Sequence, residues 1–282
     1  MKNYEGYKYI EGGVCAAKGY RANGLNCGLN PDKHKNDLCL VAADTDAVCA
    51  AVYTTNKVKG APITVTRAHL EKTGGICRAV IANSKNANTC NADGVEKAEK
   101  MCGAAAAALG LDADKVIVAS TGVIGQPLPI EPIITAAPKL AEGLSYDGNL
   151  RAATAIMTTD TVKKEVAVGF SLGGKNCRLG GMAKGSGMIC PNMATTLNFI
   201  TTDAAISRDM LQKALDEITK ITYNCLSVDG DTSTNDMVCV LADGLCKNAE
   251  ITSPGADFDS FKQALYIVMS ELTKMLAKDG EG

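Results

Sequence analysis

The 282-residue sequence has few of the residue types that mark several common functional classes. Aromatic residues make up only 4% of the chain, and its two histidines, His34 and His69, lie far upstream of the main polar motifs. A Ser–His–Asp triad therefore has no support, and acyl-transfer chemistry here would need a lysine or an amine as its base. The net charge of -2 gives no electrostatic reason to expect a nucleic acid or an anionic membrane as a partner.

Long apolar runs are also missing from the sequence. No run approaches the roughly 20 residues that a membrane-spanning helix needs, and residues 1–20 lack the apolar core of a signal peptide. We therefore expect a soluble, cytoplasmic protein.

The cysteines form no recognisable pairs, although there are 12 of them. None belongs to a C-x-x-C motif, and the two nearest in sequence are Cys239 and Cys246. Most lie in apolar runs, where cysteine behaves as a small hydrophobe, so we expect reduced core thiols rather than a disulfide framework. Neither histidine lies near a cysteine pair at ligand spacing, and no metal site is predicted.

We expect a core of small aliphatic residues, because 46% of the chain is apolar but only 4% is aromatic. Short apolar or β-branched runs predict strands at 38–43, 48–53, 78–82, 115–119, 165–170, 196–201 and 237–241. Periodicity and capping residues predict helices at 92–109, 207–221 and 258–277. Because the strands occur in groups between helices, we expect an α/β protein with the layers of an α+β sandwich rather than a doubly wound sheet. The proline-rich range 126–138 is predicted to be a loop or a connection at a domain edge.

The most unusual segment is 180–197, which combines four glycines, a single lysine at Lys184 and a proline at Pro191. The glycines permit close backbone approach, and the proline favours an extended conformation for the residue before it. The order Lys-Gly-Ser excludes a P-loop, and Gly-Ser-Gly lacks the spacers of a nucleophile elbow. On pattern alone, the segment is either a structural glycine-rich turn or a functional site.

Two further polar blocks are open to two interpretations. The range 229–236 has neither the glycine nor the glutamate that an EF-hand loop needs, so it is either a polar turn or a loop that lines an active site. The range 120–125 follows a predicted strand, where backbone N–H groups can converge on an anion, but a plain turn explains it equally well.

Residues 182–197, Met-Ala-Lys-Gly-Ser-Gly-Met-Ile-Cys-Pro-Asn-Met-Ala-Thr-Thr-Leu, closely resemble the cleavage-site signature of the ornithine acetyltransferases. This family is also called the bifunctional glutamate N-acetyltransferase / amino-acid acetyltransferase family. Residues 11–14 resemble its opening strand. Further similar blocks follow in the family's order at 53–58, 81–84, 86–88, 119–125, 156–161, 229–236 and 279–282. The resemblance covers essentially the whole chain, and several independent blocks in order argue against chance.

The resemblance implies that the chain cuts itself between Ala194 and Thr195. The cut would separate an N-terminal part, 1–194, from the start of a second chain, 195–282. The new N-terminal Thr195 would be the nucleophile that carries the acetyl group. Cleavage also supplies a base, because the freed α-amine has a reference pKa of about 7.7–8.0 and can act on its own hydroxyl.

The resemblance assigns the remaining roles to other blocks. Thr121 and Gly122 would form the oxyanion hole. The implied substrate contacts are Thr158, Thr159, Lys184, Thr195 and Glu281. The implied fold is the layered one shared by self-cleaving aminopeptidases and ornithine acetyltransferases.

The implied reaction moves the acetyl group of N2-acetylornithine to glutamate, in arginine biosynthesis, by a ping-pong mechanism. It needs no cofactor, and the sequence leaves open whether acetyl-CoA also serves as a donor. The two fragments are expected to stay associated, as a heterotetramer of two of each.

The sequence also departs from the family pattern. Thr196 stands where methionine is usual, and Lys85 stands where glycine is usual. Family chains continue beyond the Asp-Gly-Glu-Gly block of 279–282, in a region that supplies further substrate contacts. Two alternatives therefore stay open, a self-cleaving aminopeptidase with an N-terminal nucleophile and an inactive, truncated remnant.

Overall fold

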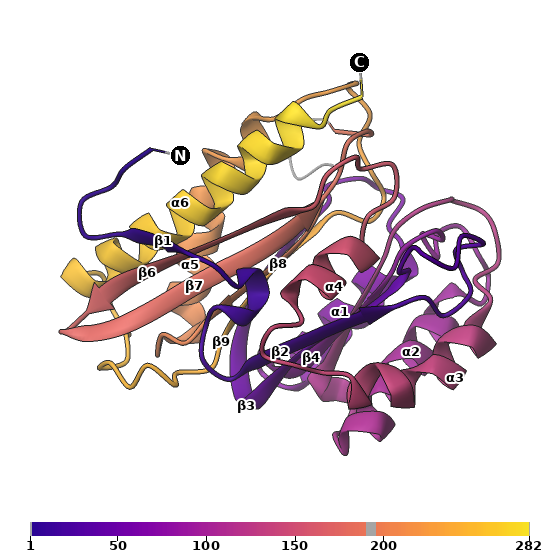
Figure 1. Cartoon of the computed structure of the whole chain (residues 1–282), viewed down its shortest axis with the longest axis horizontal. Helices are drawn as coiled ribbons and strands as arrows, with labels where there is room; N and C mark the ends of the chain where they lie inside the picture. The colour runs from indigo at the N-terminus through magenta and orange to yellow at the C-terminus, as the bar shows by residue number, and fades with distance from the viewer. Residues whose placement is uncertain (1, 190–195, 282) are drawn as a thin grey trace.

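A mixed β-sheet forms the centre of the protein (Figure 1). The computed structural model describes residues 2–189 and 196–281. Within these ranges the sheet has nine strands in the order β1-β6-β7-β8-β9-β3-β4-β5, with β2 paired to β3 beside this path. The strands are β1 (Lys8–Ile10), β2 (Tyr20–Leu25), β3 (Leu38–Tyr53), β4 (Ile76–Asn83), β5 (Val116–Ser120), β6 (Lys164–Leu172), β7 (Lys175–Lys184), β8 (Leu197–Thr202) and β9 (Met237–Ala242). Of the pairs between these strands, β4–β5 and β8–β9 are parallel.

The longest strand, β3, joins two halves of the sheet. Its register with β4 shifts between Ala42 and Ala47. The two strands predicted at 38–43 and 48–53 are therefore the two parts of one bent element. The first part pairs with β2 and β4, and the second part pairs with β9.

Three hydrophobic clusters fill the spaces between the layers. Successive strand residues point to opposite faces, and each strand divides its side chains accordingly. Val41 of β3 and Phe199 of β8 belong to one shared cluster, so the two sheet halves face each other across it. Leu40 points the other way, toward the helices that cover its half, and Ile200 likewise joins the cluster beneath the opposite helices. The result is the layered α/β sandwich that the sequence predicted.

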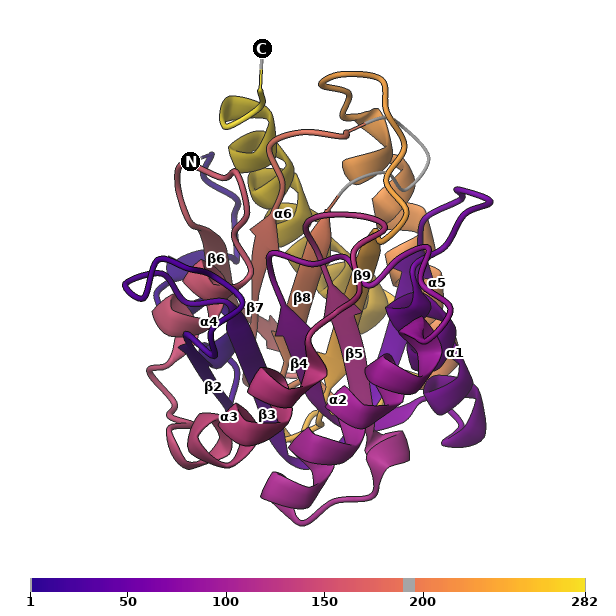
Figure 2. The ribbon, with the colours of Figure 1, turned by 90° about the vertical axis from the view of Figure 1, so that its right-hand side faces the viewer.

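Helices cover the two outer faces (Figures 1 and 2). α6 packs on β6 and β7 and α5 packs beside it on β3, whereas α1, α2 and α3 pack near β3, β4 and β5 on the other face. α4 packs on β2 within the central cluster. The helices are α1 (Ala61–Lys72), α2 (Gly94–Leu109), α3 (Ile130–Glu142), α4 (Asn149–Ala155), α5 (Arg208–Lys220) and α6 (Ala256–Lys278). The three predicted helices are confirmed as α2, α5 and α6, and Ser207 caps α5 by accepting a hydrogen bond from the backbone N–H of Met210.

The loop predicted at 126–138 is wrong over most of its length, because α3 begins at Ile130. Pro132 lies in the first turn of this helix, where no intrahelical N–H donor is required. The buried face of the helix, which includes Ile133 and Leu140, outweighs the loss of one backbone donor at Pro138.

The opening strand predicted at 11–14 is also wrong. The strand β1 ends at Ile10, and Gly12 and Gly13 both have positive φ, 111° and 46°, before a short 3-10 helix at Gly13–Cys15. Left-handed backbone cannot continue a strand. The strands β1, β2 and β7 and the helices α1 and α4 were not predicted from the sequence.

The expectation that all cysteines are reduced needs a correction. Cys177 on β7 and Cys246 after β9 form a disulfide, with their Cα atoms 5.5 Å apart. The two residues are 69 positions apart in sequence, so no local spacing could reveal the pair. The other described cysteines are free.

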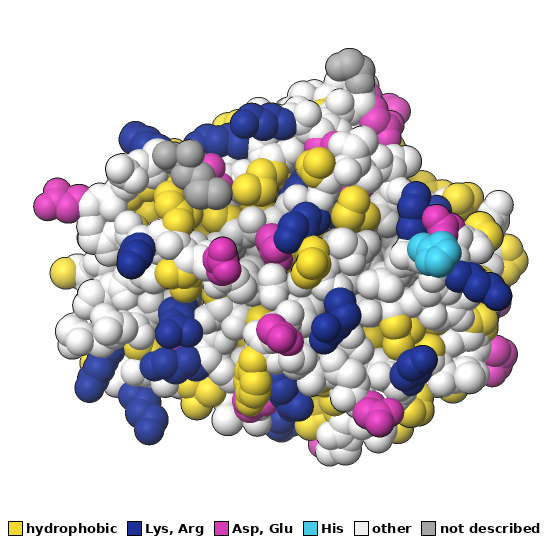
Figure 3. Space-filling model, in the orientation of Figure 1, with side chains coloured by type: hydrophobic (Ala, Val, Ile, Leu, Met, Phe, Trp, Pro, Cys, Tyr) yellow, Lys and Arg dark blue, Asp and Glu magenta, His cyan; other side chains and the backbone are white. Residues whose placement is uncertain are grey.

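The exposed surface carries charges of both signs. On the face shown in Figure 3, basic and acidic side chains are interspersed rather than gathered into one patch. Among the described residues, no helix combines the length and the apolar character that crossing a membrane requires.

The packing of α6 gives a stability prediction. Leu272 on α6 is fully buried, whereas Leu150 on α4 is 48% exposed. We expect Leu272→Ala to lower the free energy of unfolding by about 2–5 kcal/mol, because a buried cavity remains, and Leu150→Ala to change it by less than about 0.5 kcal/mol. Urea unfolding of the two variants checks this. Equal losses would contradict the arrangement of the core.

Candidate active site

A cavity of about 400 Å³ opens at one end of the sheet, where β5 and β7 finish and β9 begins. The predicted site residues that the structure describes all line it, and they are Thr121, Gly122, Thr158, Thr159, Lys184 and Glu281. They come from four separate parts of the chain, so the fold gathers them. The other two, Ala194 and Thr195, lie outside the described residues.

Lys184, the last residue of β7, lies at the base of this cavity. Its Nζ donates a hydrogen bond to Thr121 Oγ1 at 3.1 Å, and its side chain is buried. Burial lowers the pKa of Lys184, and the negative charge of Asp160 opposes that shift. Because the lysine occupies an acceptor position of the Thr121 oxygen, the threonine hydroxyl hydrogen is free to donate into the cavity.

Gly122 is held in a turn that requires glycine. Its φ is 131°, and an added Cβ would lie 2.2 Å from the carbonyl carbon of Lys85. Lys85 itself has a φ of 76°, which is uncommon for a residue with a side chain. The two turns are tied together, because Val123 N donates to Lys85 O at 3.0 Å and Thr121 N donates to Asn83 O at 3.0 Å. Lys85, which stands where the family usually has glycine, therefore keeps a left-handed backbone conformation.

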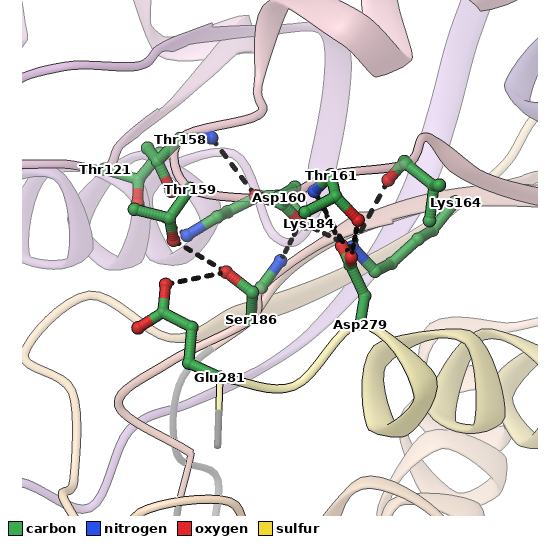
Figure 4. Close-up of polar contacts among 12 residues, drawn as sticks. Thr121, Thr158, Thr159, Asp160, Thr161, Lys164, Lys184, Ser186, Asp279 and Glu281 are labelled. Carbon is green, nitrogen blue, oxygen red and sulfur yellow. Dashed lines mark hydrogen bonds and ion pairs between the residues drawn. The ribbon is translucent and has the colours of Figure 1, made fainter.

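A buried ion cluster supports the substrate side of the cavity (Figure 4). The side chain of Lys164 is fully buried, and its Nζ lies 2.6 Å from Asp160 Oδ1 and 2.5 Å from Asp279 Oδ2. Asp160 also accepts hydrogen bonds from Thr158 N at 3.1 Å and from Gly185 N at 2.7 Å. Burial by itself would raise the pKa of Asp160, but nearby positive charge and these donors hold it below its ordinary value.

The third segment of the cluster is the end of α6. Asp279 follows α6 directly and accepts hydrogen bonds from Thr161 N, at 3.0 Å to its Oδ2. The pKa of Asp279 is also held below its ordinary value, because Lys164 and Thr161 outweigh its burial. Lys164 thus fastens three segments together, the range 158–161, the start of the glycine-rich loop and the end of α6.

Ser186 links the predicted substrate residues to one another. Its Oγ lies 2.6 Å from Thr159 Oγ1 and donates to Glu281 Oε1 at 3.3 Å. The backbone adds a further link, because Glu281 N donates to Ser186 O at 2.7 Å. Figure 4 shows the three side chains turned toward one another. Ser186 was not predicted as a site residue. Its only signal in the sequence is its position two residues after Lys184.

The polar block 229–236, left open between a turn and an active-site loop, lines the cavity through Asp229, Ser233, Thr234 and Asn235. Its last residue, Asp236, is buried and borders a small adjoining cavity with Lys184, Thr121 and Thr196. Burial raises the pKa of Asp236 well above its ordinary value.

Comparison with known proteins identifies the family. A family model described as the ArgJ family matches residues 21–282. The chain belongs to the ArgJ family. It is 46% identical over 264 residues to the arginine biosynthesis bifunctional protein ArgJ 1 of Clostridium acetobutylicum, with 93% of this chain and 64% of that protein covered. The chain therefore spans slightly under two thirds of the length of this relative.

Solved structures agree with the family and the fold. The crystal structure of the ornithine acetyltransferase of Mycobacterium tuberculosis in complex with ornithine matches with a TM-score of 0.59 and 35% identity, over 66% of this chain and 98% of that chain. The aminopeptidase of Ochrobactrum anthropi, described as a variant of the Ntn hydrolase fold, matches with a TM-score of 0.57 over 96% of this chain and 86% of that chain. At 10% identity the second match shows the fold alone.

The ion cluster gives a prediction about stability. We expect Lys164→Met to lower the free energy of unfolding by about 3–5 kcal/mol at neutral pH, because it leaves the carboxylates of Asp160 and Asp279 buried without their cation. The neighbouring Lys163, whose side chain is 44% exposed, provides the matched control. Lys163→Met should cost less than about 1 kcal/mol. Urea unfolding measures both.

The same variant should alter the response of stability to acid. The pKa values of Asp160 and Asp279 are lowered in the folded state. Their stabilising contribution is therefore complete above the ordinary carboxyl range and is lost as the pH falls through the lower folded values. We expect the difference between the wild type and Lys164→Met to shrink as the pH falls below about 4. A constant difference would contradict the ionic origin of the effect.

Proposed function

We propose that the chain is an acetyltransferase that moves the acetyl group of N2-acetylornithine to glutamate in arginine biosynthesis. The observation that carries the proposal is the hydrogen bond of 3.1 Å from Lys184 to Thr121 at the base of the cavity, in a chain of the ArgJ family. The structure of a relative with ornithine bound supports this substrate class.

The proposed cycle begins with cleavage between Ala194 and Thr195. The freed α-amine takes the proton of the Thr195 hydroxyl, and Oγ attacks the acetyl carbonyl carbon of acetylornithine. The Thr121 hydroxyl and the Gly122 N–H stabilise the oxyanion, and donors of this kind contribute a few kcal/mol each. The C–N bond then breaks, the leaving amine takes the proton from the α-ammonium group, and ornithine departs.

The second half of the cycle reverses the first with a different amine. The uncharged amine of glutamate attacks the acetyl-Thr195 ester, the same donors stabilise the oxyanion, and Thr195 Oγ leaves with a proton from glutamate. Both amino acids carry an α-carboxylate, for which Lys184 is a cationic partner at the cavity. Glu281 also lines the cavity and supplies a carboxylate, whose charge is opposite to that of Lys184.

The two fragments would remain associated after cleavage. β7 and β8, which lie on either side of the cleaved segment, pair in antiparallel fashion from Leu179↔Thr202 to Lys184↔Leu197. These hydrogen bonds do not depend on the peptide bond between Ala194 and Thr195. We extend the proposal to a heterotetramer of two of each fragment.

The proposed reaction uses no cofactor, because the α-amine and the oxyanion donors supply the chemistry. Acetyl-CoA would be a second acetyl donor to the same threonine, which the word bifunctional in the names of relatives supports. A self-cleaving aminopeptidase is the rival function, because an aminopeptidase shares the fold. Formation of acetylglutamate from acetylornithine and glutamate, against release of amino acids from peptides, distinguishes the two.

Substitution of the nucleophile tests the proposal directly. We expect Thr195→Ala to abolish both self-cleavage and acetyl transfer, because one hydroxyl performs both, and Thr195→Ser to retain part of each. Intact-mass analysis follows cleavage, and an acetylglutamate assay follows transfer. Acetyl transfer by Thr195→Ala would assign the nucleophile to another group, with Thr196 as the nearest hydroxyl.

The oxyanion hole gives a separate kinetic prediction. We expect Thr121→Ala to lower kcat by about 10²–10³ and to change KM much less, because the hydroxyl acts mainly on the transition state. Steady-state kinetics with acetylornithine as donor measures both constants. A large rise in KM at unchanged kcat would instead assign Thr121 to substrate binding.

A further inference from the structure

The loop that contains the polar block 229–236 contacts the chain just before the proposed cleavage segment. Asp229 accepts a hydrogen bond from Met188 N, and its Oδ1 accepts another from Ile189 N at 2.9 Å. The main chain pairs at the same point, because Val228 N donates to Ile189 O at 2.8 Å. Partial burial would raise the pKa of Asp229, but the donated N–H groups hold it below its ordinary value.

The other end of the same loop contacts the chain just after the cleavage segment. Met237 N donates a hydrogen bond to Thr196 O at 3.0 Å, and the buried carboxyl group of Asp236 borders the same small cavity as Thr196. β8 and β9 then continue in parallel from the pair Leu197↔Met237. Residues 188–189 and residue 196 are therefore both held by one loop.

This loop is itself fixed to the scaffold. Asn235 Nδ2 donates to Ala87 O at 2.6 Å and to Ser120 O at 2.9 Å, and Asn235 Oδ1 accepts from Thr89 Oγ1 at 2.6 Å. These partners lie in the turn after β4 and at the end of β5, beside the proposed oxyanion hole. The loop that contains Asp229 is thus fixed to the same frame as Thr121.

We infer that Asp229 is a positioning residue for self-cleavage, which holds the main chain just before the segment that contains the Ala194–Thr195 bond. The inference rests on the proposed function. Its task is geometric, because an intramolecular attack is fast only when the reacting groups are held in place. The carboxylate binds two main-chain N–H groups and leaves the nucleophile and the oxyanion donors to act.

The experiment measures the rate of self-cleavage in pulse-labelled, freshly translated chain by gel and by intact mass. The variants are Asp229→Ala and Asp229→Asn. We expect Asp229→Ala to slow cleavage by about 100-fold, the loss that a misplacement of about 1 Å produces. Asp229→Asn keeps one carbonyl acceptor for the two N–H donors, so its rate should lie between those of Asp229→Ala and the wild type.

A matched control and a folding measurement separate positioning from general stability. Asp257 at the start of α6 also accepts a main-chain N–H, from Gly173 at 3.0 Å, and Asp257→Asn should cleave at the wild-type rate. Each substitution is also placed in Thr195→Ala, where no cleavage occurs, and thermal unfolding is recorded. We expect melting temperatures near that of the parent despite slower cleavage in the active background.

The outcomes distinguish this inference from the proposed function. If the wild type cleaves before Thr195 but the Asp229 variants cleave as fast as Asp257→Asn, the inference is overturned and the proposed function stands. Slower cleavage that only follows a lower melting temperature overturns it as well. If the wild type never cleaves, both fail. Slow cleavage in a chain of unchanged stability supports the inference.

Discussion

The fully buried ammonium group of Lys164 cannot stay charged without partners, and the neutralisation it requires organises much of the cavity. Its two carboxylates come from different parts of the chain, Asp160 before β6 and Asp279 after α6. Each carboxylate has acceptor capacity left over, which it uses on backbone N–H groups of Thr161, Gly185 and other cavity-forming segments. The carboxylates that neutralise the buried charge of Lys164 thus also fix the positions of loops at the edge of the sheet, which would otherwise lack these contacts.

The glycine contacts impose a second constraint, since they set how closely backbones approach. Gly180 on β7 lies so near Gly13 that a Cβ would fall 2.0 Å from the carbonyl oxygen of Gly13, and a Cβ on Gly122 would fall 2.2 Å from the carbonyl carbon of Lys85. Side chains at these positions would push the neighbouring backbones apart near the site. The glycine-rich segment therefore serves packing through Gly180, and its Lys184 lines the cavity.

Sequence reasoning succeeded where a signal was local or where a family block was complete. The helix α6 has a clear apolar face, and Thr121 and Lys184, to which the family blocks assign roles at the site, line one cavity. It failed where long-range contacts decide the outcome. Nothing near Cys177 in the sequence indicates its bond to the distant Cys246. Nothing near Lys164 indicates its ion pair with Asp279, which lies 115 residues further along the chain. The prolines of α3 led to the wrong prediction of a loop, because burial of the apolar face of the helix outweighed the local preference of proline for loops.

The charges around the proposed oxyanion hole bear on the protonation of Asp236. Lys164 and Lys184 carry two positive charges, and Asp160 and Asp279 carry two negative ones, so this buried group is balanced. An ionised Asp236 beside the same small cavity would add a negative charge where a developing oxyanion needs stabilisation. Burial raises the pKa of Asp236 well above its ordinary value and so opposes that ionised form. The same carboxyl group borders the small cavity together with Thr121 and Lys184, so its protonation affects the charge beside the proposed oxyanion hole.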